Sequence, residues 1–111
     1  MLLPFSAAVR RCWMAEVLHP DEISRRVAGM DGWQVEGKEL ACEFKFTSYL
    51  AGAAFVSDVA QVAEAANHHP DLYLGWRKVT VRLSTHSKGG ITELDFQLAE
   101  RISQLFGASG S

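Results

Sequence analysis

Two segments of the chain alternate apolar and polar residues with a period of two, and this alternation constrains the fold more than any other feature. In the segment from Glu39 to Thr47 every second residue is apolar, and the same holds from Lys78 to Thr85. Successive side chains of a strand point to opposite faces of a sheet. Each segment is therefore predicted to be a strand with one buried face and one solvated face, as in antiparallel sheets.

Helical spacing of apolar residues, with start and stop signals, predicts three helices. Proline and acidic residues favour a first helical turn, whereas glycine or a left-handed asparagine ends a helix. His19 is interpreted as a cap before Pro20, and Asn67 as a terminator. On these signals the helices run from Pro20 to Asp31-Gly32, from about Tyr49 to Ala66, and from Thr92 to Gly107.

Two shorter strands, Trp33 to Val35 and Leu72 to Leu74, come just before the long ones and complete the predicted order. That order is helix, two strands, helix, two strands, helix. It predicts a single α+β domain, a four-stranded antiparallel sheet with helices on one face. We expect residues 1–13 to be a disordered extension, 14–106 the folded domain and 107–111 a flexible tail.

The composition favours an ordinary globular protein and argues against two classes. A formal net charge of −2 is not that of a general nucleic-acid binder, and no apolar run approaches the roughly 20 residues that span a bilayer. Cys12 and Cys42 lack metal-type spacing, so we expect a reduced, cytoplasmic protein. Cys42 lies on the apolar side of its strand and is interpreted as a core residue rather than a nucleophile.

Three of the four histidines lie near the predicted ends of elements, beside two carboxylates. His68 and His69 follow a helix and His86 follows a strand, with Glu64 and Asp95 nearby in the sequence. Imidazoles titrate near neutral pH, so one can donate a proton while another accepts one. We therefore expect the three rings to surround one hollow and to perform acid–base chemistry, with Glu64 orienting a ring or holding the N–H of a heterocycle.

Other interpretations of these residues stay open. A zinc site is disfavoured because the histidines lack the usual ligand spacing, and a covalent nucleophile because neither cysteine lies in the cluster. Asp95, three residues after Thr92, resembles the acid of a capping box more than a catalyst. Trp33 and Trp76 are more often core residues than walls of a ligand site, although Trp76 could be such a wall.

The motifs together resemble the pterin-4a-carbinolamine dehydratase family. The resemblance rests on E-x-x-x-HHP at 64–70, STH at 84–86, GG-x-T at 89–92 and Asp95, with F-x-F at 44–46 upstream. It covers about Leu18 to Ile102. It implies dehydration of 4a-hydroxytetrahydropterin to quinonoid dihydropterin, which recycles the pterin of aromatic amino acid hydroxylases, and it implies no metal or separate cofactor.

The resemblance also implies the site and the partners. In the family picture the first and third histidines are acid and base, the second binds pterin, Glu64 lies near the pterin, and Asp95 lies near the third histidine. Dimers join sheets edge to edge, sometimes forming tetramers. Some relatives instead assist a protein partner, for which a helix stripe from Ile91 to Leu105 is a candidate surface, although its periodicity favours core or homodimer surface. The expected catalytic residues are His68, His69 and His86, and the expected substrate-binding residues are Glu64, Pro70, Trp76 and Asp95.

Overall fold

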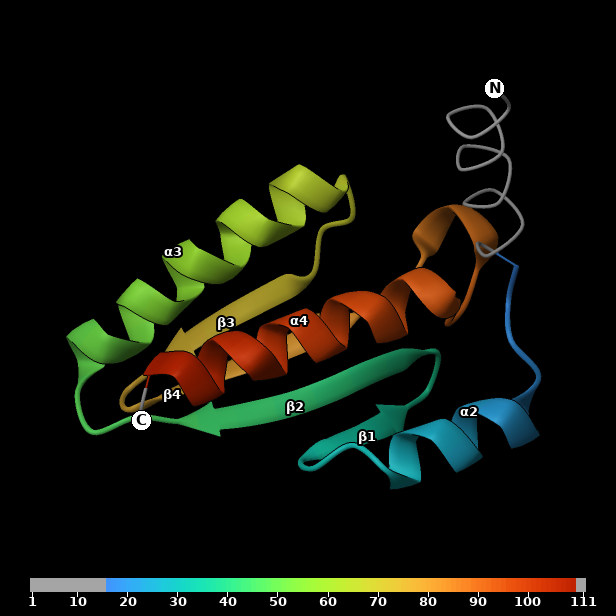
Figure 1. The fold of residues 1–111 in the computed structure, drawn as a ribbon, viewed down its shortest axis with the longest axis horizontal. Coiled ribbons are helices and arrows are strands. Elements are labelled where there is room, and N and C mark those ends of the chain that lie inside the picture. Colours follow the sequence, from blue (N-terminus) through green and yellow to red (C-terminus); the bar gives the residue numbers. More distant parts are fainter. Residues whose placement is uncertain (1–15, 110–111) are drawn as a thin grey trace.

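The computed structural model describes residues 16–109, in which helices lie on one face of a four-stranded antiparallel sheet (Figure 1). This arrangement confirms the predicted α+β class and the order of its helices and strands. The elements are α2 (Pro20–Ala28), β1 (Trp33–Glu36), β2 (Glu39–Lys45), α3 (Tyr49–Ala66), β3 (Asp71–Gly75), β4 (Lys78–Leu83), the short 3-10 helix η1 (His86–Lys88) and α4 (Glu93–Ser109).

The two long alternating segments are the central strands of the sheet, whose order is β1-β2-β4-β3. Cys42 of β2 pairs with Val81 of β4, and Leu72 of β3 pairs with Val81 from the other side. Because the register aligns apolar positions across the strands, their side chains gather on one face. Val81 is fully buried there, which confirms the face predicted from the alternation.

An aromatic cluster joins α3 and α4 to this face. Phe55 of α3 lies 5.0 Å from Phe44 and 5.1 Å from Phe46, measured between ring centroids. Phe106 of α4 lies 4.9 Å from Phe44. The tilted and edge-on ring arrangements are those that aromatic pairs prefer. Trp33 is also buried and donates its indole N–H to Ser103 at 2.8 Å, which confirms its role as a core residue.

Capping residues fix the ends of α2 and α3. His19 accepts a hydrogen bond at Nδ1 from the Asp21 N–H, as predicted for a cap, and Ser48 accepts one from Ala51. At the other end of α3, Asn67 is left-handed with φ 53°, and its N–H reaches the carbonyls of the last helical turn. The chain therefore leaves α3 at His68, where the candidate site begins.

Three predicted boundaries were wrong. Helix α2 ends at Ala28 rather than at Asp31, because Gly29 already caps its last turn. Strand β4 ends at Leu83, since Thr85 pairs only with Gly90 in an isolated bridge. Helix α4 continues through Gly107 to Ser109, and Gly107 does not adopt the positive φ of a left-handed terminator. Residues 1–13, predicted to be disordered, lie outside the described residues.

The stripe from Ile91 to Leu105 faces the core of the same chain. Ile91, Leu98 and Ile102 are buried, and Leu105 packs against the core. The sequence left open whether this stripe would be core, dimer surface or a site for a partner helix. In the described part of the chain it is core, the interpretation that its periodicity favoured, and this leaves no partner surface on the stripe.

Truncation of Phe55 should destabilise the fold strongly. Its side chain is 2% exposed and contacts aromatic rings in β2, directly after β2 and in α4, so Phe55→Ala leaves a cavity. We expect the free energy of unfolding to fall by about 3–5 kcal/mol in urea titrations. Leu50→Ala, at a position 78% exposed in the same helix, is the control and should change it little. Equal losses in the two variants would contradict this packing.

Cys42 should be an unreactive thiol in the folded protein. Burial, with a smaller effect of Glu43, raises the pKa of its thiol from 9.0 to about 11. At pH 8 this lowers the thiolate fraction about 100-fold relative to the unfolded chain, and the thiolate is the reactive form. In a Cys12→Ser background, alkylation at pH 8 should be at least that much slower in native protein than in denaturant, and should accelerate as the pH approaches 11. Equal rates would contradict the burial of this thiol.

Candidate active site

A histidine–carboxylate pair lies where α3 ends and α4 begins. His68 Nε2 is 2.6 Å from Asp95 Oδ1, across 27 residues of sequence. The Asp95 side chain is fully buried, whereas the His68 side chain keeps 12% of its surface exposed. A buried carboxylate is stable only when its oxygens accept hydrogen bonds. His68 therefore provides a hydrogen-bond partner for the buried Asp95, and a small part of the His68 side chain remains accessible to solvent.

The second oxygen of Asp95 is held by two further donors. Asp95 Oδ2 accepts a hydrogen bond from Thr85 Oγ1 at 2.9 Å and another from the Thr92 N–H at 2.9 Å. The Thr92 bond is the reciprocal contact of a capping box at the start of α4, and it confirms the predicted cap. From the sequence, Asp95 was interpreted as a helix cap rather than a catalytic residue. In the structure, the carboxylate that caps α4 through Oδ2 also directs its Oδ1 toward His68.

The second pair joins His69 and Glu64 and is exposed. His69 Nε2 is 2.9 Å from Glu64 Oε1, and their side chains are 57% and 81% exposed. In a continuous helix Glu64 would face His68, four residues later. The left-handed residue Asn67 turns the chain between them, so Glu64 reaches His69 instead. This pair offers polar atoms at the surface beside the buried pair.

His86 is exposed at the start of η1, next to Thr85. Thr85 N donates to Gly90 O, and Thr85 O accepts from the N–H groups of Lys88 and Gly89. The backbone around His86 is thus fixed to the residue whose side chain bonds Asp95. The resemblance placed Asp95 near the third histidine. Asp95 bonds Thr85, the residue before His86, while the imidazole that it bonds directly is that of His68.

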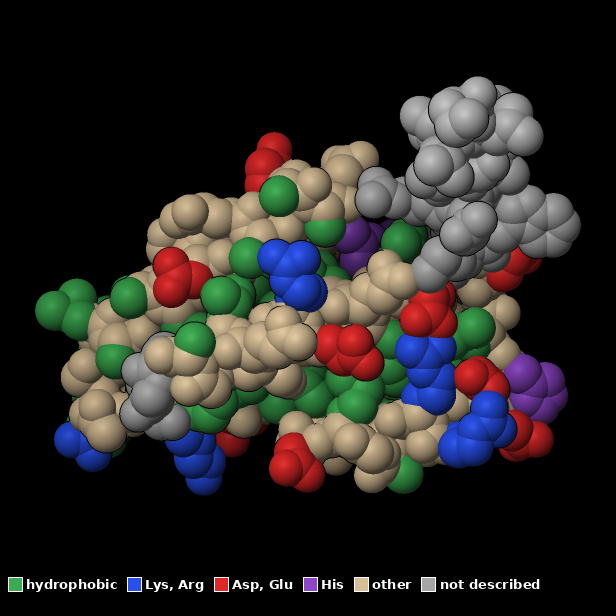
Figure 2. Space-filling model, in the orientation of Figure 1, with side chains coloured by type: hydrophobic (Ala, Val, Ile, Leu, Met, Phe, Trp, Pro, Cys, Tyr) green, Lys and Arg blue, Asp and Glu red, His purple; other side chains and the backbone are tan. Residues whose placement is uncertain are grey.

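The end of α3, helix η1 and the start of α4 lie at the same end of the molecule (Figure 1). Histidine side chains are visible in a recess between α3 and α4 (Figure 2). Half-buried Pro70 follows the two histidines and leads into β3. The ends of these elements therefore bring His68, Asp95 and Thr85, the residue before His86, together.

Trp76 is separated from this group within the chain. It occupies the turn between β3 and β4, at the opposite end of β3 from Pro70, about 16 Å away by the rise of a strand. It is 73% exposed and stacks with Arg77, whose guanidinium carbon is 4.7 Å from its ring. Trp76 is thus neither a core residue nor a wall of this site, and both interpretations of it were wrong.

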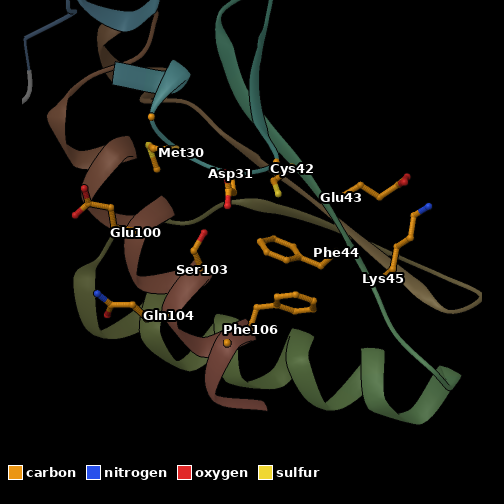
Figure 3. Close-up of a pocket in the computed structure, with 13 residues that line it drawn as sticks. Met30, Asp31, Cys42, Glu43, Phe44, Lys45, Glu100, Ser103, Gln104 and Phe106 are labelled. Atoms are coloured by element: carbon orange, nitrogen blue, oxygen red, sulfur yellow. The ribbon is translucent and has the colours of Figure 1, made fainter. Parts of the chain in front are cut away.

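A cavity elsewhere in the described chain lacks a histidine–carboxylate pair. It has a volume of about 720 Å³ and lies between the α2–β1 turn, β2 and α4. Phe44 and Phe106 face each other in it, while Glu43 and Lys45 extend away from them (Figure 3). The three clustered histidines are not among its lining residues. The candidate site is therefore chosen for its histidines and buried carboxylate, not for the volume of a cavity.

Comparison with known proteins agrees with the motifs. The family model for pterin 4 alpha carbinolamine dehydratase matches residues 16–105. The chain belongs to this dehydratase family. A relative from Roseiflexus castenholzii is 46% identical over 92 residues, which cover 83% of this chain and 99% of the relative. One from Natronomonas pharaonis is 45% identical over 92 residues, covering 83% and 98%. Both carry the provisional name pterin-4-alpha-carbinolamine dehydratase.

Two solved structures of the dehydratase type resemble the fold. A transcriptional coactivator/pterin dehydratase from Brucella melitensis has a TM-score of 0.78 and 33% identity, covering 83% of this chain and all of that one. A pterin dehydratase-like protein identified as a RuBisCO assembly factor in the alpha-carboxysome has a TM-score of 0.60 and 28% identity, covering 70% and 93%. Proteins with different described roles thus share the dehydratase fold.

Two further findings concern metals and membranes. Within residues 16–109, no group of three or more His, Cys, Asp or Glu side chains is placed to hold a metal ion. In the same range, no helix is long and apolar enough to cross a membrane.

Asp95→Asn should destabilise the protein, and the exposed pair supplies a matched control. An amide in place of the buried carboxylate weakens or removes bonds to three donors, so we expect a loss of about 1–3 kcal/mol in the free energy of unfolding. Glu64→Gln alters the solvated partner of His69 and should leave that free energy unchanged within error. Chemical denaturation of both variants tests this. Equal effects would show that burial does not distinguish the two pairs.

Proposed function

We propose that the protein catalyses dehydration of pterin-4a-carbinolamine to quinonoid dihydropterin and water. In this elimination the hydroxyl leaves carbon 4a and a proton leaves the neighbouring nitrogen, so that a C=N double bond forms. The departing hydroxyl takes up one proton and becomes water. The reaction therefore needs a proton donor and a proton acceptor in one site.

His68 and His86 are proposed as this acid–base pair. The observation that carries the proposal is the buried Asp95, which bonds His68 through Oδ1 and reaches the residue before His86 through Oδ2. The Asp95 carboxylate thus bonds the ring of His68 and also the side chain of Thr85, the neighbour of His86. A positioned histidine that transfers a proton typically contributes about 10²–10⁴ in rate.

His69 and Glu64 are proposed to bind the pterin. Their exposed pair lies beside His68 and is open to solvent on both side chains. A pterin ring carries N–H groups that the Glu64 carboxylate can accept, while an imidazole can donate to ring oxygen or nitrogen. Pro70, which follows directly, is proposed to complete this edge of the substrate site.

The proposed reaction also suggests a functional partner, a location and an oligomeric state for the protein. The substrate is the pterin product of aromatic amino acid hydroxylases, so a functional link to such a hydroxylase is proposed, in the cytoplasm and with no metal or separate cofactor. A homodimer or homotetramer is also proposed. Its support is that β1 and β3 are the edge strands of the described sheet, where a second sheet could pair.

An assembly or dimerisation role is the alternative function. It is supported by the likeness to the RuBisCO assembly factor. It is weakened because the stripe from Ile91 to Leu105 is core. The dehydratase proposal is favoured, since it alone uses the buried Asp95 and the three histidines.

The test is a stopped-flow assay with enzymatically generated carbinolamine. His68→Ala and His86→Ala should each lower kcat by about 10²–10⁴, whereas His69→Ala should mainly raise KM. His19→Ala is the control: this fourth histidine caps α2, with an exposed side chain, and its loss should leave turnover unchanged. Wild-type turnover in the His68 and His86 variants would refute the acid–base pair, and an inactive wild-type protein would favour the assembly role.

A further inference from the structure

We propose that Thr85 is a positioning residue of this site, which orients Asp95 through its hydroxyl and thereby fixes the hydrogen-bonded state of His68. The kinetic part of this inference rests on the proposed dehydratase function, but its structural part does not. Thr85 is 5% exposed and Asp95 is fully buried, so water does not compete freely for their bond. The sequence had placed Thr85 only at the end of a strand.

The hydroxyl hydrogens around Asp95 can be assigned from donor and acceptor chemistry. A carboxylate only accepts hydrogen bonds, so Thr85 Oγ1 donates its hydrogen to Asp95 Oδ2. Thr85 Oγ1 must then accept from Thr92 Oγ1, which lies 2.8 Å away. Thr92 Oγ1 in turn accepts from the Leu94 N–H at 3.2 Å. The hydrogen bonds therefore all donate in the same direction: from the Leu94 N–H to Thr92 Oγ1, from there to Thr85 Oγ1, and from there to the Asp95 carboxylate.

This directed series determines which atom of Asp95 faces His68. Two donors, Thr85 Oγ1 and the Thr92 N–H, hold Oδ2, so Oδ1 is the oxygen turned toward the imidazole. His68 Nε2 must donate to Oδ1, and in the neutral ring Nδ1 then carries the lone pair. We infer that Nδ1 is the atom through which His68 exchanges protons with the substrate.

Thr85 is itself held rigidly, as a positioning residue must be. Its N–H donates to Gly90 O at 2.9 Å, and its carbonyl accepts from Lys88 and Gly89 at 2.9 Å each. Gly89 is left-handed with φ 78°, a conformation that lets the chain fold back over Thr85. The same residue therefore fixes the backbone of His86 and, through Asp95, the ring of His68.

The experiment measures solvent exchange of the His68 Nε2–H by NMR on protein with ¹⁵N-labelled histidine, together with kcat and KM. In Thr85→Val, which keeps the shape but removes the hydroxyl, exchange should be about tenfold faster or more, because a bond to the charged partner is lost. We expect kcat to fall by a similar factor and KM to stay within about twofold. Thr85→Ser restores the hydroxyl and should restore both wild-type values.

Thr80→Val is the matched control, since it makes the same change on β4 at a half-buried threonine outside the site. It should alter neither quantity. If Thr85→Val does not fold, Thr85→Ala is measured in its place. A His68 N–H that is unprotected in wild-type protein, or equally protected without the Thr85 hydroxyl, would overturn the inference. Because N–H exchange is independent of turnover, an inactive wild-type protein would refute the dehydratase proposal without deciding this one.

Discussion

The arrangement of the site depends on one buried carboxylate. Asp95 is fully buried, and its two oxygens accept hydrogen bonds from His68, from Thr85 and from the backbone N–H of Thr92. These donors come from the exit of α3, the exit of β4 and the start of α4. A buried charge with any of these donors missing would be costly, so the carboxylate holds the ends of three elements together.

The rest of the fold supplies the rigid frame that such a carboxylate needs. The register of β2, β4 and β3 aligns one apolar face, and the aromatic cluster around Phe55 fixes both long helices on it. The left-handed Asn67 then releases the chain from α3 at a defined point. Rigid elements therefore determine where the imidazoles lie, and the loops add only short connections.

The sequence predicted the elements well because their signals are local. Alternation in β2 and β4, the cap at His19 and the capping box of Thr92 and Asp95 each involve residues a few positions apart. The pairing of Asp95 with His68 rather than His86 spans 27 residues and depends on how α3 and α4 pack, which no local pattern encodes. Trp76 was misjudged for the same reason, since its distance from the histidines is set by the length of β3. The resemblance to the family indicated Asp95 and the three histidines, but it could not give their hydrogen-bond partners.

The two histidine–carboxylate pairs differ in environment, and this difference supports different roles. Glu64 and His69 interact in water, where such a pair contributes little to stability and both groups remain free to meet a ligand. Asp95 and His68 interact inside the protein, where the carboxylate is already committed to its three donors and only part of the imidazole reaches solvent. Donors fixed before substrate arrives need no reorganisation during the reaction. The buried pair is therefore suited to proton transfer and the exposed pair to recognition, and the same capping bond that starts α4 keeps the buried pair in place.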